Sequence, residues 1–354
     1  MRMMSRFARK PRETFGLDIG TSAVKVVQLR QRAGRLTLTA LSSASLPPDA
    51  IGDGTIKAPD AVAATIRDAV SRAGVTCREA VIGIAGRALI TKKVQLPEVP
   101  PRELRDAVEL EAEHHIPFAF DEVFLDYHVA RRHDGVMDLV IVAVKKSKVN
   151  EYVGVVEQAG LVPVIVDVDS FAVGNEFELN HPEPSRDAVA LIDMGAAVMK
   201  TNVVRGGIPA FARDIPFGGN QYTQAIADRL RTSFEQAERA KVGEATDIAW
   251  DRIVPALESV SRDLALEVRR TFDYFGSTSS ESERIGRVVM SGGAARLRGL
   301  TEYLSATWSI PVEVARPFEG IDVDAELADE ARAAGPALAV AVGLALRSTG
   351  DRRE

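Results

Sequence analysis

The sequence predicts an α/β fold made of two similar halves. Three glycine-bearing turns each follow an apolar, β-branched run that is typical of a buried strand. Glycine lets backbone N–H groups approach an anion closely, as a phosphate-binding turn requires. A strand-turn-strand-turn-strand layout also occurs twice, once in each half of the chain. The turns are Asp18–Lys25, Asp193–Ala196 and Ser291–Ala294.

The composition is that of an ordinary globular protein, and 354 residues are enough for two domains. A net charge of −6 argues against a general nucleic-acid binder. The single cysteine, Cys77, excludes a disulfide within one chain and favours a reducing compartment. Residues 1–13 carry five positive charges without an apolar core. This pattern predicts a basic flexible tail rather than a signal peptide, with contact to anionic lipid as the alternative.

The first half is expected to begin with a three-stranded meander, followed by a helix and a fourth strand. The helix shows apolar residues at helical spacing and ends near Gly74, a plausible C-cap. The expected elements are strands Phe15–Ile19, Val24–Arg30, Leu36–Leu41 and Ala80–Ile84, and helix Asp60–Ala73.

A proline-rich segment at 96–101 marks a boundary, after which the pattern predicts an inserted α-β-β-α unit of roughly seventy residues. Pro117 ends its first helix, and Gly160 follows its second. The expected elements are helix Arg102–His115, strands Glu122–Arg131 and Asp138–Val144, and helix Lys148–Ala159.

The second half repeats the meander after a linking strand and helix, and closes with an apolar helix near residues 336–346. A Gly-Gly pair at 206–207 indicates a hairpin turn. The expected strands are Val162–Val168, Ala188–Met194, Lys200–Arg205, Ile208–Ile215, Arg287–Met290 and Val312–Ala315. The expected helices are Ser170–Leu179, Gln221–Leu230, Phe234–Lys241, Ile253–Phe275 and Leu297–Thr307.

The three turns in this order resemble those of the actin-like ATPase superfamily, in which two RNase-H-like domains close over ATP and Mg²⁺. Within the insertion, Glu111–Phe118 (EAEHHIPF), with Asp121–Val123 and Leu125–Tyr127, resembles the PilM family of type IV pilus assembly proteins. Residues Phe15–Ser22 and Gly335–Leu344 resemble the same family. The resemblance implies an actin-like fold with an inserted α/β subdomain of the type found in the division protein FtsA.

The resemblance also implies domain boundaries. The first actin-like domain, 1A, would comprise residues 14–90, 161–186 and 335–354. Residues 91–160 would form the inserted subdomain, 1C, and residues 187–334 the second actin-like domain, 2A and 2B.

The first turn is expected to bind phosphate. Asp18 ends a strand, where it could hold Mg²⁺ through bound water. Backbone N–H groups of Gly20, Thr21 and Ser22 would face the β-phosphate. Lys25 follows Asp18 by seven residues, the spacing at which actin-like proteins bring a lysine to the phosphates. Without the other two turns, an ordinary hairpin with an exposed lysine would explain this motif equally well.

In the second turn, Asp193 and Gly195 match the other phosphate-binding position, and Asp193 is a second candidate for Mg²⁺ and for catalysis. The superfamily usually has a hydroxyl residue five positions after this aspartate, but this chain has Val198. A water-positioning residue would come from Asp167 or Asp169, although a strand-end or N-cap role explains both equally well. We therefore expect firm ATP binding with slow or no hydrolysis.

Adenosine is expected to lie against the third turn and one helix. Glu238 and Lys241 are three residues apart on one helical face, as in the adenosine-contacting helix of the superfamily. Gly292 and Gly293 would give the base close access to the backbone. A surface ion pair is the alternative for Glu238 and Lys241.

The resemblance implies a cytoplasmic ATP-binding adaptor of type IV pilus assembly. Such proteins bind the cytoplasmic N-terminal tail of the inner-membrane protein PilN in a groove beside the inserted domain, so membrane association would be indirect. Contacts with pilus motor ATPases and self-association are further expectations, and nucleic acid is not an expected partner. The alternatives are an FtsA- or MreB-like polymerising ATPase and a small-molecule kinase. Against the FtsA alternative, members of that family are expected to carry a linker and a membrane-binding helix at the C-terminus, whereas only eight residues follow Leu346 in this sequence.

Overall fold

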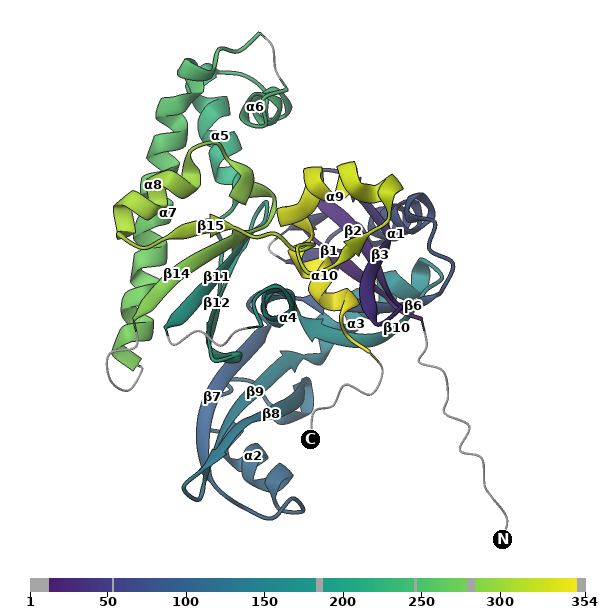
Figure 1. Ribbon diagram of the computed structural model, residues 1–354, viewed down its shortest axis with the longest axis vertical. Coiled ribbons are helices and arrows are strands. Elements are labelled where there is room, and N and C mark those ends of the chain that lie inside the picture. The colour runs from purple at the N-terminus through teal and green to yellow at the C-terminus, as the bar shows by residue number, and fades with distance from the viewer. Residues whose placement is uncertain (1–12, 53, 183–186, 245–246, 279–283, 349–354) are drawn as a thin grey trace.

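The computed structural model describes residues 13–52, 54–182, 187–244, 247–278 and 284–348. Two large sheets each form the centre of one half, and a smaller sheet projects from the first half (Figure 1). Apart from Glu13, the basic tail expected at residues 1–13 lies outside the described residues. Within these ranges, no helix has both the length and the apolar character needed to cross a membrane.

The first sheet contains the predicted meander and two strands parallel to its first strand. β1, the first strand of the meander, lies in the interior of the sheet, and all of its residues are buried. It pairs antiparallel with β2 on one side and parallel with β6 on the other. In the order β10-β6-β1-β2-β3-β16, the strands are β10 (Val162–Val168), β6 (Glu79–Ile84), β1 (Phe15–Ile19), β2 (Ala23–Arg32), β3 (Arg35–Ser45) and β16 (Asp322–Val323).

The second sheet repeats this arrangement. Its central strand, β11, pairs antiparallel with the next strand in sequence and parallel with β14. The strand order therefore matches the β3-β2-β1-β6-β10 part of the first sheet, which confirms the prediction of two similar halves. In the order β13-β12-β11-β14-β15, the strands are β13 (Ile208–Ile215), β12 (Met199–Arg205), β11 (Ala188–Met194), β14 (Ile285–Ser291) and β15 (Val312–Val314).

Helices cover both faces of the first sheet. α1 (Pro59–Ala73) and α3 (Lys146–Gln158) pack on one face, and Gly74 ends α1 with a left-handed C-cap, as predicted. α4 (Asp169–Asn180) and α10 (Ala339–Ala345) lie between the two large sheets, where their apolar side chains join strands of both halves in one cluster. The two halves therefore share a hydrophobic core.

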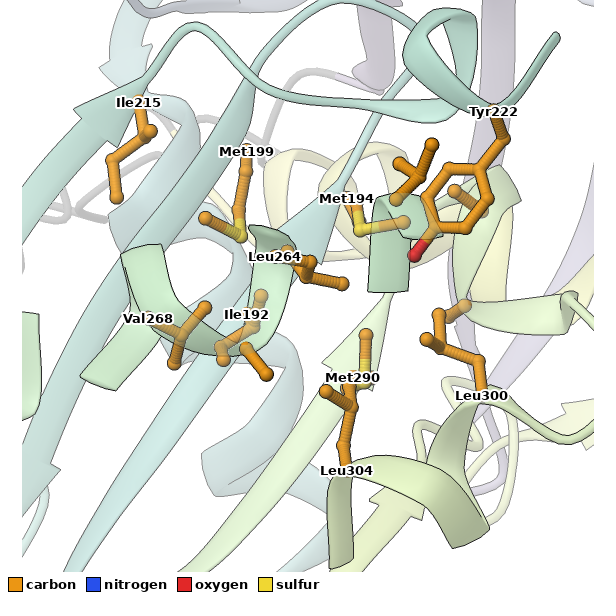
Figure 2. Close-up of a cluster of buried hydrophobic side chains, with 14 of the residues drawn as sticks. Ile192, Met194, Met199, Ile215, Tyr222, Leu264, Val268, Met290, Leu300 and Leu304 are labelled. Carbon is orange, nitrogen blue, oxygen red and sulfur yellow. The ribbon is translucent and has the colours of Figure 1, made fainter. Parts of the chain in front are cut away.

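The outer face of the second sheet is covered by helices of the second half. Met194 and Met290 at the ends of two parallel strands pack against helix residues such as Leu264 and Leu304 (Figure 2). These helices are α5 (Gly219–Leu230), α6 (Phe234–Lys241), α7 (Trp250–Thr278) and α8 (Leu300–Trp308). Gly293–Arg296 and Gly335–Leu338 form 3-10 turns, and α9 (Ala328–Ala334) precedes the second of them.

The inserted unit is a three-stranded sheet with one covering helix. Its strand order is β7-β9-β8, from β7 (Leu89–Pro97), β9 (Val136–Lys145) and β8 (Val123–His133). α2 (Leu104–Ala112) packs Val108 against Leu139 and Ile141 on one face. A short hairpin, β4 (Ile51–Gly52) and β5 (Thr55–Ile56), lies on the first half.

The expected α-β-β-α order of the insertion is wrong in two respects. The first strand, β7, was missed because it is a half-exposed edge strand with Lys92 and Lys93 at its centre and Pro97 at its end. Helix α3 belongs to the first half, since Tyr152 and Val156 are buried in the core of its sheet. We therefore propose that the inserted unit spans residues 89–145.

Candidate functional site

Two equivalent aspartate–lysine pairs lie at the ends of the two central strands. The Lys25 ammonium donates a hydrogen bond of 2.8 Å to Oδ2 of Asp18, its cross-strand neighbour in the β1–β2 pair. The Lys200 ammonium donates one of 3.0 Å to Oδ2 of Asp193, its cross-strand neighbour in the β11–β12 pair. In both pairs the lysine follows the aspartate by seven residues. The internal repeat of the fold thus extends to its charged side chains.

Lys200 also reaches the other half. Its ammonium lies 3.0 Å from Oδ2 of Asp169, the first residue of α4. Sequence reasoning missed Lys200, although its spacing from Asp193 equals that of Lys25 from Asp18 and was a usable signal. The structure therefore brings together Asp18, Lys25, Asp169, Asp193 and Lys200.

Burial and charge set the protonation of this cluster. Burial raises the pKa of Asp169 to about 6, against the opposing effect of Lys200. Burial acts in the same direction at Asp193, but Lys200 and Lys25 outweigh it and hold the pKa of that carboxyl below its usual value. At Lys200 the neighbouring carboxylates outweigh burial and raise the pKa well above its usual value. At neutral pH, Asp169, Asp193 and Lys200 are therefore all charged, with two carboxylates around one ammonium.

The two turns that are expected to bind phosphate close on themselves in the same way. The Gly20 N–H donates to the Ala23 carbonyl, and the Gly195 N–H donates to the Val198 carbonyl, both at 3.1 Å. These two N–H groups are therefore engaged inside their turns. Within the described residues, the N–H groups of Thr21 and Ser22 in the first turn, and of Ala196 and Ala197 in the second, donate no backbone hydrogen bond, so they are available to an anion.

Asp167, the other candidate for positioning water, has a different neighbour from Asp169. Its Oδ2 accepts a hydrogen bond of 2.5 Å from Arg347, and its Oδ1 accepts one from the N–H of Val168. Asp169, in contrast, pairs with Lys200 of the cluster.

On the adenosine side, Lys241 is buried among oxygen atoms. Its ammonium donates to Glu238 at 2.6 Å, to the Thr223 hydroxyl at 2.8 Å and to the Gly219 carbonyl at 3.1 Å. Burial lowers the pKa of Lys241, partly offset by Glu238. The pair is thus a fixed part of the α5–α6 junction rather than a mobile surface ion pair.

The third turn lies against the start of the second turn and against α5. At Gly292, with φ of +85°, an added Cβ would lie 2.4 Å from the Met194 carbonyl oxygen, so only glycine fits there. An added Cβ at Gly219 would lie 3.6 Å from the Cβ of Ala294, which places α5 beside this turn. Gly293 has no atom within 4 Å of such a Cβ and so faces open space. The structure brings the predicted adenosine residues to one side of the second sheet.

The two expected metal carboxylates differ in how well they suit Mg²⁺. Both Asp193 oxygens are occupied, since Oδ1 accepts a hydrogen bond of 3.0 Å from the Ser291 hydroxyl and Oδ2 accepts one from Lys200. Within the described residues, Asp18 accepts a side-chain hydrogen bond from Lys25 at Oδ2, which leaves Oδ1 for a metal-bound water. No set of three or more acidic, histidine or cysteine residues in the described ranges has the geometry to hold a metal directly.

A separate cavity of about 1210 Å³ lies between the inserted sheet and the second half. Its walls come from the edge strands β7 and β13, with Phe171 of α4 and Tyr274 of α7. None of the predicted nucleotide residues lines it. Near it, the Asp214 carboxylate on β13 accepts a hydrogen bond of 2.5 Å from the N–H of Gly86, which precedes β7. We call this cavity the β7–β13 groove.

The chain is similar in sequence and in fold to several known proteins. A family model described as type IV pilus assembly protein PilM matches residues 16–349. A solved structure described as the PilM-PilN type IV pilus biogenesis complex is 30% identical, with a TM-score of 0.83 over 96% of this chain and 99% of that chain. FtsA of Streptococcus pneumoniae is 25% identical over 346 residues, which cover 85% of this chain and 75% of FtsA. MreB5 of Spiroplasma citri bound to AMPPNP, 12% identical with a TM-score of 0.54 over 95% of each chain, shares the fold.

Proposed function

The chain belongs to the PilM family of type IV pilus assembly proteins, and from this we propose that it is an ATP-binding adaptor that captures the cytoplasmic tail of a PilN-like membrane protein. It would act at the cytoplasmic face of the inner membrane, which it reaches through that partner. The observation that carries the nucleotide part is the repeated aspartate–lysine pair at the ends of the two central strands, between halves that share a core.

In this proposal the phosphates lie between the two turns. The N–H groups of Thr21 and Ser22 would donate to them, and Lys25 would exchange its bond to Asp18 for a phosphate oxygen. Mg²⁺ bound to ATP would neutralise part of the phosphate charge, and Asp18 is the residue that would hold it through water. Adenosine would lie between Lys241 and the open face of Gly293.

The β7–β13 groove is the proposed site for the partner tail. Two edge strands border it, and an extended peptide binds such strands through main-chain hydrogen bonds. Phe171 and Phe211 on its walls offer apolar surface for the side chains of a peptide. The groove joins the inserted unit, as the resemblance implies for the PilN tail.

A change in the bound nucleotide would be transmitted to this groove through the neighbouring strands β12 and β13. Lys200 on β12 is the cross-strand neighbour of Asp214 on β13, and Asp214 holds the N–H of Gly86 at the start of the inserted unit. A change at Lys200 on nucleotide binding would therefore shift one wall of the groove relative to the other. A ligand alters its partner's affinity only by such a difference between two states.

Hydrolysis is expected to be slow. Val198 provides no hydroxyl to the phosphates, and Asp169 is held by Lys200 instead of being available to orient a water molecule. Because contacts of this kind act mainly in the transition state, their loss lowers turnover while binding stays adequate. Turnover of many ATP molecules per second would contradict this proposal.

The adaptor function can be tested by calorimetric titration of the PilN-like tail peptide into the purified protein, with and without Mg·ATP. We expect saturable peptide binding whose affinity changes about threefold or more with ATP. Lys25→Met, which removes the ammonium proposed to bind the phosphates, should abolish the ATP effect and leave binding in the absence of nucleotide. Thr91→Trp, which fills the groove, should weaken the peptide, whereas Thr55→Trp on the exposed β5 should not. Absence of peptide binding by folded protein that takes up ATP would exclude the adaptor function.

A further inference from the structure

Lys200 occupies the place where a metal contact of the second half would be expected. Its ammonium lies 3.0 Å from Oδ2 of Asp193 and 3.0 Å from Oδ2 of Asp169. All three side chains are nearly buried, with exposed fractions of 12% for Lys200, 10% for Asp169 and 7% for Asp193. A cation held between two buried carboxylates is the arrangement that a divalent ion would otherwise provide.

The remaining oxygen atoms of these carboxylates are poorly placed to bind a metal. Asp193 Oδ1 is engaged by the Ser291 hydroxyl. Asp169 Oδ1 is buried without a hydrogen-bond partner and lies against Gly83, where an added Cβ would be only 2.0 Å away. Since Mg²⁺ demands nearly octahedral geometry, neither carboxylate can serve it while Lys200 remains between them.

We propose that the Lys200 ammonium is a built-in cation that replaces the metal contact of the second half, so that this chain binds ATP with little dependence on Mg²⁺. The inference rests on the proposed nucleotide site and concerns its metal requirement. Removing the Lys200 charge would leave three carboxylates, Asp18, Asp169 and Asp193, facing one ammonium, Lys25. Oxygen-rich, anionic sites of this kind favour Mg²⁺ and Mn²⁺.

The test compares the Kd for ATP in excess Mg²⁺ with that in excess EDTA, by calorimetry, for the wild type and Lys200→Met. The wild-type Kd should differ by less than about threefold between the two media, and that of Lys200→Met by about tenfold or more. Lys25→Met is the matched control, because it removes the equivalent lysine of the first half. It should weaken ATP binding in both media and leave Asp169 and Asp193 paired with Lys200.

A second readout uses no nucleotide. Mn²⁺ added to the apo protein and followed by electron paramagnetic resonance should stay free with the wild type and bind to Lys200→Met. If Lys200→Met does not fold, the double variant Asp169→Asn/Lys200→Met removes the negative charge of Asp169 that would otherwise be buried without a partner. This double variant then replaces Lys200→Met in the ATP comparison.

Two results are decisive against the inference. A wild-type Kd for ATP that rises about tenfold or more in EDTA would overturn it and leave the nucleotide site intact. Absence of ATP binding in both media would overturn the nucleotide site as well. A Lys200→Met variant that folds and shows the wild-type response to EDTA would also contradict the role given to Lys200.

Discussion

Asp169 and Lys200 come from different halves of the chain, and their side chains meet at 3.0 Å. Asp169 begins α4, whose apolar face belongs to the core shared by both sheets, whereas Lys200 lies on β12 of the second sheet. Rotation of one half against the other would have to stretch or break this buried pair. The pair therefore favours one relative orientation of the halves in the absence of nucleotide.

We predict that Lys241→Met lowers ATP affinity about tenfold or more, because it removes a buried ammonium that holds Glu238, Thr223 and Gly219 together at the proposed adenosine site. Arg239→Met, on the exposed face of the same helix, is the control and should bind ATP like the wild type. Fluorescence titration with a labelled ATP analogue measures the affinity of each variant. Equal affinities for the two variants would place adenosine elsewhere.

Stability should depend on pH through Glu176. Burial raises the pKa of this carboxyl to about 7 from its ordinary 4.5. Because the folded state then binds the proton more tightly, Glu176 favours folding at low pH, and this contribution is lost as pH rises toward 7. Glu176→Gln keeps an oxygen for Asn180 without the charge. Urea unfolding should show Glu176→Gln more stable than the wild type by up to about 3 kcal/mol at pH 8, and nearly equal to it at pH 4. A difference independent of pH would refute this.

Gly343→Ala should be severely destabilising. A Cβ at this position would lie 1.8 Å from the Ala172 carbonyl oxygen, where α10 crosses α4 between the sheets. We expect a loss of about 3 kcal/mol or more in unfolding free energy, since overpacking at a backbone contact cannot relax cheaply. Gly154→Ala, inside α3 with no atom within 4 Å, should instead stabilise the protein by about 0.5–1 kcal/mol. Thermal unfolding of the two variants, monitored by circular dichroism, tests this. Similar melting temperatures for Gly343→Ala and Gly154→Ala would contradict the prediction.

Val198→Thr should restore the hydroxyl that actin-like proteins place in the second phosphate turn. One hydrogen bond to a charged phosphate contributes about 1.5–3 kcal/mol, so we expect ATP to bind about tenfold more tightly or to be hydrolysed correspondingly faster. Ala197→Ser, which adds a hydroxyl one position earlier, should change neither quantity. Parallel calorimetry and phosphate-release assays would test this, and identical behaviour of the two variants would argue against phosphate at Val198.

The sheets and turns could be predicted because local patterns determine them. β1 and β11 are continuous apolar runs that end in an Asp-x-Gly turn, and the structure has them at the predicted residues. The predictions that were wrong concerned elements whose position depends on tertiary contacts. β7 has an exposed, lysine-bearing edge and therefore lacks the pattern of a buried strand. α3 has an apolar face that could serve either the insertion or the first half, and only packing decides between them.

The charged site was predictable only in part for the same reason. Asp167 and Asp169 are two residues apart at a strand-to-helix junction, and sequence alone does not determine which of them turns toward Lys200. The partner of Asp167 is Arg347, 180 residues later in the chain. The Asp193–Lys200 pair, in contrast, repeats the seven-residue spacing of Asp18 and Lys25 and is therefore visible in the sequence itself.

The placement of α10 has a consequence for how the protein is made. This helix lies at the far end of the chain from β1, yet it covers one face of the first sheet and packs against α4. During synthesis on the ribosome, the first sheet therefore emerges long before the helix that shields it. The nascent chain must keep that apolar face from associating wrongly until α10 has been translated. Truncation within the last elements should thus disturb the N-terminal sheet more than the second half, whose outer core is complete earlier.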